Sequence, residues 1–255
     1  MYRYVSSSTN PPPALPPVMV KVDGEAIIPN EKGQFVLPES DDNGFICYTD
    51  GENNYNPGYV FENITESVDL ESVTLSFSML SGASFRYNTP SGIRFYSDVD
   101  TDLIEKLRED GASIEVGTLI APKDYLDDKE LTFESGVTYA LVKYESNVWY
   151  ENDDFKGIIG SIVNIKECNL NREFVGRGYI KFTQDGVTKT IYANYDNNDI
   201  KNNSRSICYI ANQVMIHNAN TLPLEYAEIV KGYADLYTGS DKYTSLDPDG
   251  EDIFE

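Results

Sequence analysis

The chain has 255 residues, 40% of them hydrophobic, which is enough material for one large core or two modest ones. Its 42 acidic residues against 20 basic ones give a formal net charge of −22, a field that repels nucleic acid and anionic membrane surfaces. No run approaches the roughly 18 apolar residues of a membrane span. We therefore expect a globular protein that neither binds nucleic acid nor inserts into a membrane.

Residues 1–17 are rich in Ser, Thr, Asn and Pro, and the segment Pro11–Pro17 favours an extended polyproline spacer. We predict a tether here. The segment lacks the apolar core of a secretory signal. We expect that export information lies outside this chain, or that the protein reaches the exterior by another route, as a virion component does.

Residues 18–78 consist of short apolar runs separated by turn residues, a pattern typical of brief strands. Asp50-Gly51 predicts a tight hairpin turn, and Pro57-Gly58 predicts a type II turn. Alternating apolar and polar residues over 68–77 predict a closing strand of this compact β domain. Its other predicted strands cover residues 18–22, 26–28, 34–37 and 44–48.

Residues 79–238 form a larger region in which predicted strands alternate unevenly with helices. Asp102 and Glu105 have capping-box spacing, and Gly111 falls where the resulting amphipathic helix would end. Two further helices are predicted, one that follows Asn203 or Ser204 and includes His217, and one over residues 224–237. The predicted strands cover residues 83–87, 93–96, 114–120, 137–142, 148–150, 158–165, 179–182 and 188–195.

Residues 239–255 predict an acidic tail or linker. Their Asp-Pro-Asp-Gly run is like a calcium loop only superficially, because the ligand spacing and bidentate Glu of an EF-hand are missing. The three cysteines, Cys47, Cys168 and Cys208, show no zinc-site spacing, and we interpret them as buried small residues. A Cys168–Cys208 bridge is an open alternative. We expect neither a metal nor another cofactor.

Several motifs between residues 18 and 78 together resemble the internalin-type B repeat of bacterial surface proteins. They are Val22-Asp23-Gly24, Leu37-Pro38, Gly44-Phe45, Tyr48-Thr49-Asp50-Gly51, Tyr55, Pro57-Gly58 and Val68-Asp69-Leu70. The resemblance implies a β-grasp-like fold and a role as a stalk or spacer that presents other domains. Tyr48 stands where the family usually has a buried Trp, so we expect Tyr48 to be buried.

A second resemblance covers residues 79–238 and concerns a module of large secreted proteins of gut Firmicutes. It is carried by Gly82-Ala83-Ser84-Phe85-Arg86, Ser91-Gly92-Ile93-Arg94-Phe95, Gly117-Thr118-Leu119-Ile120-Ala121-Pro122, Asn171-Arg172-Glu173-Phe174-Val175-Gly176-Arg177-Gly178-Tyr179 and Ser204-Arg205-Ser206-Ile207. It implies a secreted or cell-surface location without an activity. The fold class we predict is β-rich α+β, with a small β-grasp-like domain followed by a larger mixed-sheet or sandwich domain that has two or three helices.

The residue inventory offers little for catalysis, because His217 is the only histidine and no serine-hydrolase, phosphate-loop or metalloprotease motif is present. We interpret His217 as a structural or surface residue and expect no enzyme. Two carboxylates can by themselves hydrolyse glycosides, so a glycan-active enzyme stays an alternative. Glu167 and Glu173 would be its first candidates.

Arginines and aromatic residues supply the candidate binding sites. Guanidinium groups suit carboxylates, sulfates and sugar hydroxyls, although they also pin strands together through ion pairs. The rings of Tyr144, Trp149 and Tyr150 could stack on sugars, or they could simply pack in a core. Polar residues lie between and after them, namely Glu145, Asn147 and Asn152. The candidate ligand-binding residues are Trp149, Tyr150, Tyr144, Arg86, Arg94, Arg172 and Arg205, with Arg177 in a similar motif.

Together these features predict a non-catalytic adhesion or ligand-binding protein on a cell surface or in the secreted fraction. Its partner would be a glycan or a protein of a cell surface or extracellular matrix. The alternatives are a structural spacer, a virion fibre or decoration protein, and the carboxylate-dependent enzyme.

Overall fold

The computed structural model describes residues 18–40, 42–144, 149–152, 155–184, 186–195 and 204–239. The chain divides into two compact units, residues 1–74 and 75–255. Strands dominate, and three α-helices lie in the second unit, so the predicted β-rich α+β class is confirmed. The predicted tether and nearly all of the predicted acidic tail lie outside the described residues.

The first unit is built on a mixed five-stranded sheet with the order β2-β1-β7-β4-β5. Its central strands β1 and β7 are parallel, and the outer pairs are antiparallel. This is the strand order of a β-grasp sheet, and the short pair β3–β6 lies in the connections. The strands are β1 (Val20–Val22), β2 (Glu25–Ala26), β3 (Phe35–Val36), β4 (Phe45–Thr49), β5 (Asn54–Tyr55), β6 (Val60–Phe61) and β7 (Val68–Thr74).

The turns of the first unit show which local predictions hold. Gly58 has a φ of 75°, and the Tyr59 amide donates to the Asn56 carbonyl (3.1 Å), which confirms the type II turn. Strands β4 and β5 pair from Thr49 to Asn54, so Asp50 opens a four-residue loop and not a two-residue hairpin turn. The predicted strand over residues 68–77 is confirmed as β7, but it ends earlier, at Thr74.

Tyr48 is buried in the core of the first unit, as predicted, where its ring packs 4.8 Å from Phe45. Its hydroxyl donates to the Pro38 carbonyl (3.1 Å), which satisfies the one polar group that the ring brings inside. Burial, aided by the carboxylates of Asp23 and Glu39, raises the pKa of this phenol.

The second unit is a sandwich of two sheets, with the strand orders β13-β14-β10-β8 and β12-β11-β15-β16, and β9 paired to β10. The sheets approach so closely at Gly160 that a Cβ there would lie 2.3 Å from the Cβ of Thr118. The strands are β8 (Phe77–Met79), β9 (Ser84–Arg86), β10 (Gly92–Val99), β11 (Ser113–Pro122), β12 (Ala140–Lys143), β13 (Tyr150–Asn152), β14 (Phe155–Val163), β15 (Phe174–Gln184) and β16 (Val187–Tyr192).

The segment 123–139 covers the outer face of the second sheet and forms an additional core with it. Leu126, Leu131 and Val137 of this segment are buried, and they pack with Leu119 of β11 and Tyr179 of β15. The predicted strand over residues 137–142 is therefore shorter than expected, since β12 begins only at Ala140. The apolar side chains of this loop thus cover the outer face of the sheet and keep solvent from it.

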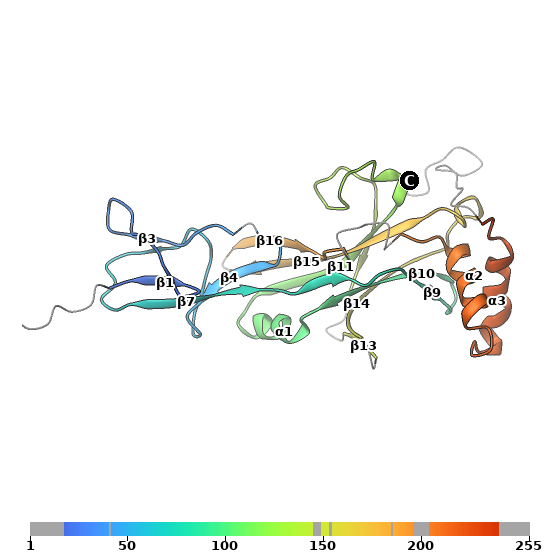
Figure 1. Ribbon diagram of the computed structural model, residues 1–255, viewed down its shortest axis with the longest axis horizontal. Coiled ribbons are helices and arrows are strands. Elements are labelled where there is room, and N and C mark those ends of the chain that lie inside the picture. The colour runs from blue at the N-terminus through green and yellow to red at the C-terminus, as the bar shows by residue number, and fades with distance from the viewer. Residues whose placement is uncertain are drawn as a thin grey trace, which may run out of the picture. The chain divides into compact units, whose positions relative to one another are not determined.

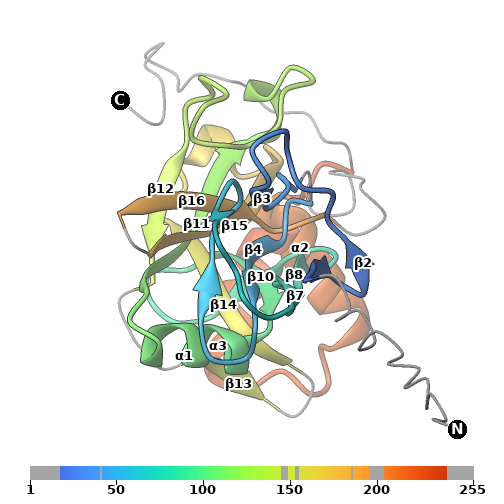
Figure 2. The same cartoon turned by 90° about the vertical axis from the view of Figure 1, so that its left-hand side faces the viewer.

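Helix α1 (Thr101–Glu109) joins the two sheets and lies beside β14 in both views (Figures 1 and 2). Its N-cap is Asp100, whose side chain accepts from the Leu103 amide (3.0 Å), so the predicted capping box at Asp102 is wrong. The predicted end of this helix near Gly111 is confirmed. The amides of Gly111 and Ala112 donate back into the last turn, and Gly111 has a φ of 95°, as in a Schellman motif.

Helices α2 (Ile207–His217) and α3 (Leu224–Asp235) lie side by side next to β9 (Figure 1). Ser206 caps α2 by accepting from the Tyr209 amide (3.2 Å), so the helix begins later than predicted. Phe85 of β9 packs edge-on against Tyr233 of α3 at a ring distance of 5.5 Å. Among the described residues, no helix is both long and apolar enough to span a membrane.

All three cysteines are free. Cys47 and Cys208 are buried, as predicted, whereas Cys168 is half-buried. The Cys168–Cys208 bridge that the sequence left open is absent.

Candidate functional site

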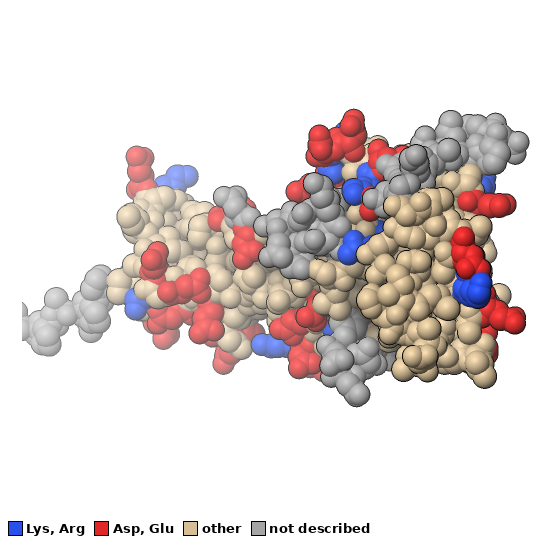
Figure 3. Space-filling model, turned by 45° about the vertical axis from the view of Figure 1, so that its right-hand side comes forward, with Lys and Arg blue, Asp and Glu red and all other residues tan. Residues whose placement is uncertain are grey.

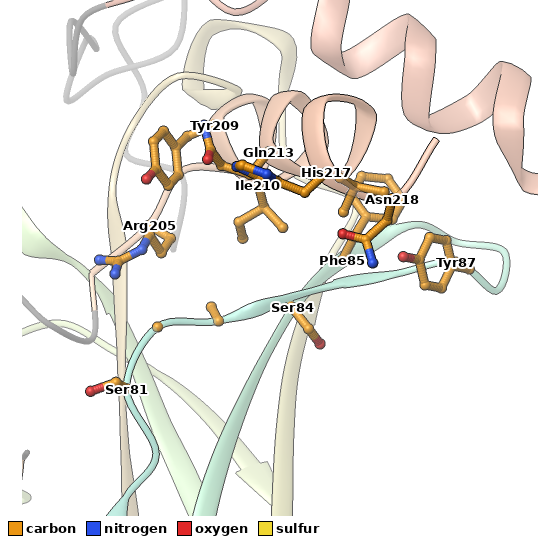
Figure 4. Close-up of a pocket in the computed structure, with 13 residues that line it drawn as sticks. Ser81, Ser84, Phe85, Tyr87, Arg205, Tyr209, Ile210, Gln213, His217 and Asn218 are labelled. Atoms are coloured by element: carbon orange, nitrogen blue, oxygen red, sulfur yellow. The ribbon is translucent and has the colours of Figure 1, made fainter. Parts of the chain in front are cut away.

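A pocket of about 360 Å³ opens between α2 and the segment that leads into β9. Its volume lies at the lower end of the range typical of small-ligand sites. Figure 4 shows α2 along one side and β9 along the other, with Arg205 at one end and Tyr87 at the opposite end. It is lined by Ser81, Gly82, Ala83, Ser84, Phe85, Tyr87, Arg205, Tyr209, Ile210, Gln213, Val214, His217 and Asn218.

The polar side of the pocket is a stripe at helical spacing. Arg205, Tyr209, Gln213 and His217 follow one another at intervals of four residues, which places them on one face where the chain is helical. Ile210 starts a second series, parallel to the first, that contributes the apolar lining of α2. The stripe therefore offers a guanidinium, a phenol, an amide and an imidazole to one ligand.

The opposite side comes from the turn between β8 and β9 and from the residues after β9. Gly82 has a φ of 82°, a left-handed conformation that favours glycine. Ser84 is engaged elsewhere, because its hydroxyl is hydrogen-bonded to the Tyr96 hydroxyl at 2.7 Å. Tyr87 stacks on Tyr226 of α3 with a ring distance of 5.2 Å, which anchors that end of the pocket.

Charge distinguishes this pocket from the rest of the chain. None of its described lining residues is an aspartate or glutamate, although the net charge is −22. Residues 206–224, which include α2, contain no Asp, Glu, Lys or Arg. The side of the molecule that carries α2 and α3 comes forward in Figure 3 and shows a broad uncharged area bordered by charged side chains. A pocket in the first unit has an acidic lining instead, which includes Asp23, Asp50, Asp69 and Glu71.

Arg205 is held at the pocket by its backbone and its side chain. Its amide donates to the Phe174 carbonyl (2.9 Å), and its own carbonyl accepts from the Phe174 amide (3.0 Å). The Nη1 atom donates to the Ser204 carbonyl (2.6 Å), and the guanidinium carbon lies 5.8 Å from the Tyr209 ring. Arg205 is thus the predicted ligand-binding residue that the structure places in the pocket wall.

Trp149 does not offer the open platform that stacking on a sugar requires. Only 8% of the residue is exposed, and its Nε1 donates to Oε1 of Glu105 (2.8 Å). Tyr144 lies nearly parallel to the indole at 6.5 Å, and the Arg108 guanidinium is 5.5 Å from it. Tyr150 is turned to another neighbour, Tyr96, at 6.0 Å. We assign Trp149 to packing against α1 and Tyr150 to packing against β10. The side chains of Glu145, Asn147 and Asn152 lie outside the described residues.

Arg172 has the surroundings of a structural residue. It is completely buried, its Nε and Nη2 donate to the two carboxylate oxygens of Asp124 (2.9 and 2.8 Å), and its Nη1 donates to Asn169 (3.2 Å). The Tyr125 ring lies 4.5 Å from the guanidinium carbon. Burial opposes the charged form, but the bonds to Asp124 outweigh it and raise the pKa of Arg172. No ligand can reach this group, so the predicted binding role is corrected to a structural one.

Arg177 is likewise buried, where its Nη1 pairs with Glu130 (2.9 Å) and its Nε donates to the Ala193 carbonyl (3.0 Å). Arg86 donates to the carbonyls of Asn88 and Pro90 and so pins the turn after β9. These contacts engage both guanidinium groups in holding backbone together.

Arg94 lies on β10, paired with Ser84 of β9 and Ser161 of β14. Burial raises the pKa of the Tyr87 phenol, and the nearby positive charge of Arg94 acts in the opposite direction. Arg94 is therefore close to one end of the pocket without lining it.

The two carboxylates proposed for glycoside hydrolysis have different surroundings. Glu173 is bound to Lys123 through Oε2 (2.6 Å), and Ser204 donates to its Oε1 (3.4 Å). Glu167 lies in a short 3-10 helix, η2 (Glu167–Asn169), on the surface. Within the described parts of the chain, no three His, Cys, Asp or Glu side chains gather as metal ligands.

The sequence prediction missed Tyr87, Tyr209 and Gln213 as site residues and assigned His217 a structural or surface role. The four-residue spacing of Arg205, Tyr209, Gln213 and His217 was present in the sequence, as was the uncharged stretch around them. What could not be found there was the opposite wall, because it comes from residues 81–87.

Comparison with protein-family models, with curated proteins and with solved structures finds no match to this chain.

Proposed function

We propose that this chain is an extracellular, surface-displayed binding module without catalysis, and that it binds a saccharide of a cell surface or extracellular matrix in the α2–β9 pocket. The observation that carries the proposal is the pocket lining: hydrogen-bonding groups of four kinds, next to aromatic rings, with no carboxylate among the described lining residues. Phenol, amide and imidazole groups can both donate and accept, which suits the many hydroxyls of a sugar.

The contact surface is also suited to the body of a sugar ring. Tyr209 and Ile210 present apolar area beside Gln213, so dispersion contacts with C–H groups and hydrogen bonds with hydroxyls can form together. His217 is exposed at the rim of the same stripe. We assign these groups of the pocket wall to ligand binding and not to catalysis.

The extracellular location and the role of the first unit rest on the two sequence resemblances. The β-grasp strand order of the first unit is compatible with an internalin-type repeat, which would act as a spacer that presents the second unit. A purely structural spacer or a virion decoration protein would share this architecture but would not need the pocket.

Glycan-array screening of the whole chain, followed by titration calorimetry on the hits, tests the proposal. Gln213→Ala should weaken binding by roughly tenfold or less, since it removes one or two hydrogen bonds. Asn212→Ala is the matched control, because Asn212 is the neighbour on α2 that does not line the pocket. A chain that binds no glycan, or one whose binding both variants alter equally, contradicts the assignment; binding to a surface protein alone would replace the saccharide by a protein ligand.

A further inference from the structure

We infer that a second ligand site lies on the outer face of the sheet that contains β10, where Arg94 and Ser161 receive the sulfate or carboxylate group of an acidic glycan. Neither residue lines the α2–β9 pocket, so the inference goes beyond the proposed function. Sulfate and carboxylate share the chemistry of an oxyanion, which a guanidinium binds through two parallel N–H donors.

Arg94 projects from the outer face of the sheet because side chains alternate along β10. Its neighbours Ile93 and Phe95 are completely buried, whereas Arg94 is half-buried and can be reached from solvent. Strand β14 alternates in the same way, since Gly160 faces Thr118 of the other sheet. Ser161 therefore points away from that sheet, as Arg94 does.

Arg94 has one serine on either side of it across the sheet. It lies directly opposite Ser84 of β9 and Ser161 of β14, and side chains in such positions have Cβ atoms about 4.5–5.5 Å apart. Figure 4 shows Ser84 pointing away from α2, so this face lies on the other side of β9 from the pocket. Among the described residues, no hydrogen-bond partner holds the Ser161 hydroxyl, which can donate to an oxygen that Arg94 binds.

The Arg94 guanidinium is not used by the fold. The chain has 42 Asp and Glu residues, yet in the parts that the structure describes Arg94 has neither an ion pair nor a hydrogen bond. Arg172 and Arg177, in contrast, are both paired with carboxylates of the chain. The donors of Arg94 are thus left for water or for a ligand.

The charge around Arg94 favours an anion. Arg86 of β9 is its diagonal neighbour on the same face, about 7–8 Å away. The bonds of Arg86 go to the carbonyls of Asn88 and Pro90, which are neutral and leave its charge uncompensated. An oxyanion at Arg94 would therefore be attracted by two positive charges that otherwise repel each other.

The carboxylate of Asp98 is too distant to oppose this attraction strongly. Asp98 is the next acidic residue along β10 on the same face, about 13 Å from Arg94 at 3.3 Å per residue. Beyond about 8 Å, exposed charges are largely screened at physiological salt. The net charge of −22 therefore acts only weakly on an anion bound at Arg94.

Apolar surface next to Arg94 favours a glycan over a free inorganic anion. Tyr96 and Ile159 lie opposite each other on the same face, two positions further along β10 and β14, and both are half-buried. This distance of about 7 Å is within reach of a sugar ring that carries the anionic group. The ring would gain dispersion contacts there that inorganic sulfate cannot make.

Calorimetric titration of the whole chain with matched sugars tests the inference. The pairs are glucose 6-sulfate with glucose and methyl glucuronide with methyl glucoside, and sodium sulfate is the third probe. At least one acidic sugar should bind roughly 10- to 100-fold more tightly than its neutral partner, the range of one charge-assisted contact. That preference should shrink as NaCl rises, and the pair that shows it identifies the group as sulfate or carboxylate.

Arg94→Gln should remove the preference for the acidic sugar. Lys106→Gln is the matched control, because Lys106 is an exposed residue of α1 that likewise has no ion pair among the described residues. Arg94→Lys keeps the charge without the planar fork and should retain part of the preference, which keeps the test valid should the Gln variant fold poorly. The arginine Nε–H NMR signal that is missing in Arg94→Lys should shift in the wild-type chain when the acidic sugar is added.

This site and the pocket fail in different ways. Equal affinity for the acidic and neutral members of both pairs, or equal weakening by Arg94→Gln and Lys106→Gln, overturns the inference. Sodium sulfate that binds as tightly as the acidic sugars would overturn the glycan. Gln213→Ala should weaken the neutral sugars and leave the Arg94 NMR shift in place; if it abolishes that shift, the anion lies in the pocket and the second site is wrong.

Discussion

Arg172 and Arg205 both lie in the second unit and both were predicted to bind a ligand, but the fold surrounds them differently. Arg172 is fully buried, and a carboxylate and an amide accept from its guanidinium. Arg205 is half-buried in the wall of a pocket whose described lining has no carboxylate, and its Nη1 donates to the Ser204 carbonyl. Where an acidic chain pairs a buried arginine with its own carboxylate, the arginine holds the fold; where the lining is free of acids, the arginine can serve a ligand.

The largest expected effect is the loss of stability in Arg172→Met. The variant leaves Asp124 and Asn169 without their buried partner, and breaking such a pair costs about 3–5 kcal/mol. Arg205→Met should cost less, because Arg205 is half-buried in a pocket wall and not enclosed in the core. Urea denaturation of both variants measures the difference. Equal losses would break the distinction between the two arginines.

An intermediate effect is expected at the caps of α2 and α1. Ser206→Ala and Asp100→Ala each remove the side chain that accepts from the helix N-terminus, at a cost of about 1 kcal/mol. Since α2 carries the pocket stripe, only the Ser206 variant should also weaken saccharide binding. Denaturation and calorimetry on both variants separate the two quantities, and a binding loss in Asp100→Ala would mean that the pocket responds to general destabilisation.

Glu173→Gln should have a smaller effect. Its half-buried ion pair with Lys123 (2.6 Å) is partly screened by water, so we expect a loss of about 1 kcal/mol with unchanged saccharide binding. Denaturation and calorimetry measure this, and reducing-end release from a glycan panel tests the alternative enzyme. Wild-type turnover that Glu173→Gln abolishes would show that the carboxylate is catalytic.

The smallest effect concerns thiol reactivity and leaves stability unchanged. Burial raises the pKa of the Cys208 thiol to about 11, which lowers its thiolate fraction at pH 8 roughly 100-fold below that of an ordinary cysteine. Half-buried Cys168 should therefore react first with Ellman's reagent, and Cys208 should react at the ordinary rate only after unfolding. Because Cys208 lies on the inner side of α2, rapid native-state labelling would show that this helix opens.

Local patterns were sufficient for much of the fold. The type II turn at Pro57-Gly58, the helix end at Gly111 and the buried Tyr48 follow from backbone preferences and apolar character, which act over a few residues. The wrong prediction of the helix cap is also local in origin. Asp102 matched a capping pattern, but Asp100 lies one position before the helix and satisfies the free amide of Leu103 first.

The candidate site was predicted less well, because its walls come from residues 81–87 and 205–218, which are far apart in the chain. The same limitation applied to Trp149, which is buried and donates a hydrogen bond to Glu105 of α1, 44 positions away in the sequence. Tyr144 and Tyr150, which flank it, pack with Trp149 and Tyr96 respectively. Spacing alone could not separate stacking platforms from packed rings.

By itself, the sequence determined the β-rich α+β class, the helical segments and the strongly acidic balance, because periodicity, turn residues and charge counts are properties of short segments or of the whole composition. Only the tertiary structure decided which arginine lines a pocket and which is paired with a buried carboxylate. That distinction depends on long-range pairing, since Asp124 reaches Arg172 and Gly82 faces Arg205 only once the sheets and helices have packed.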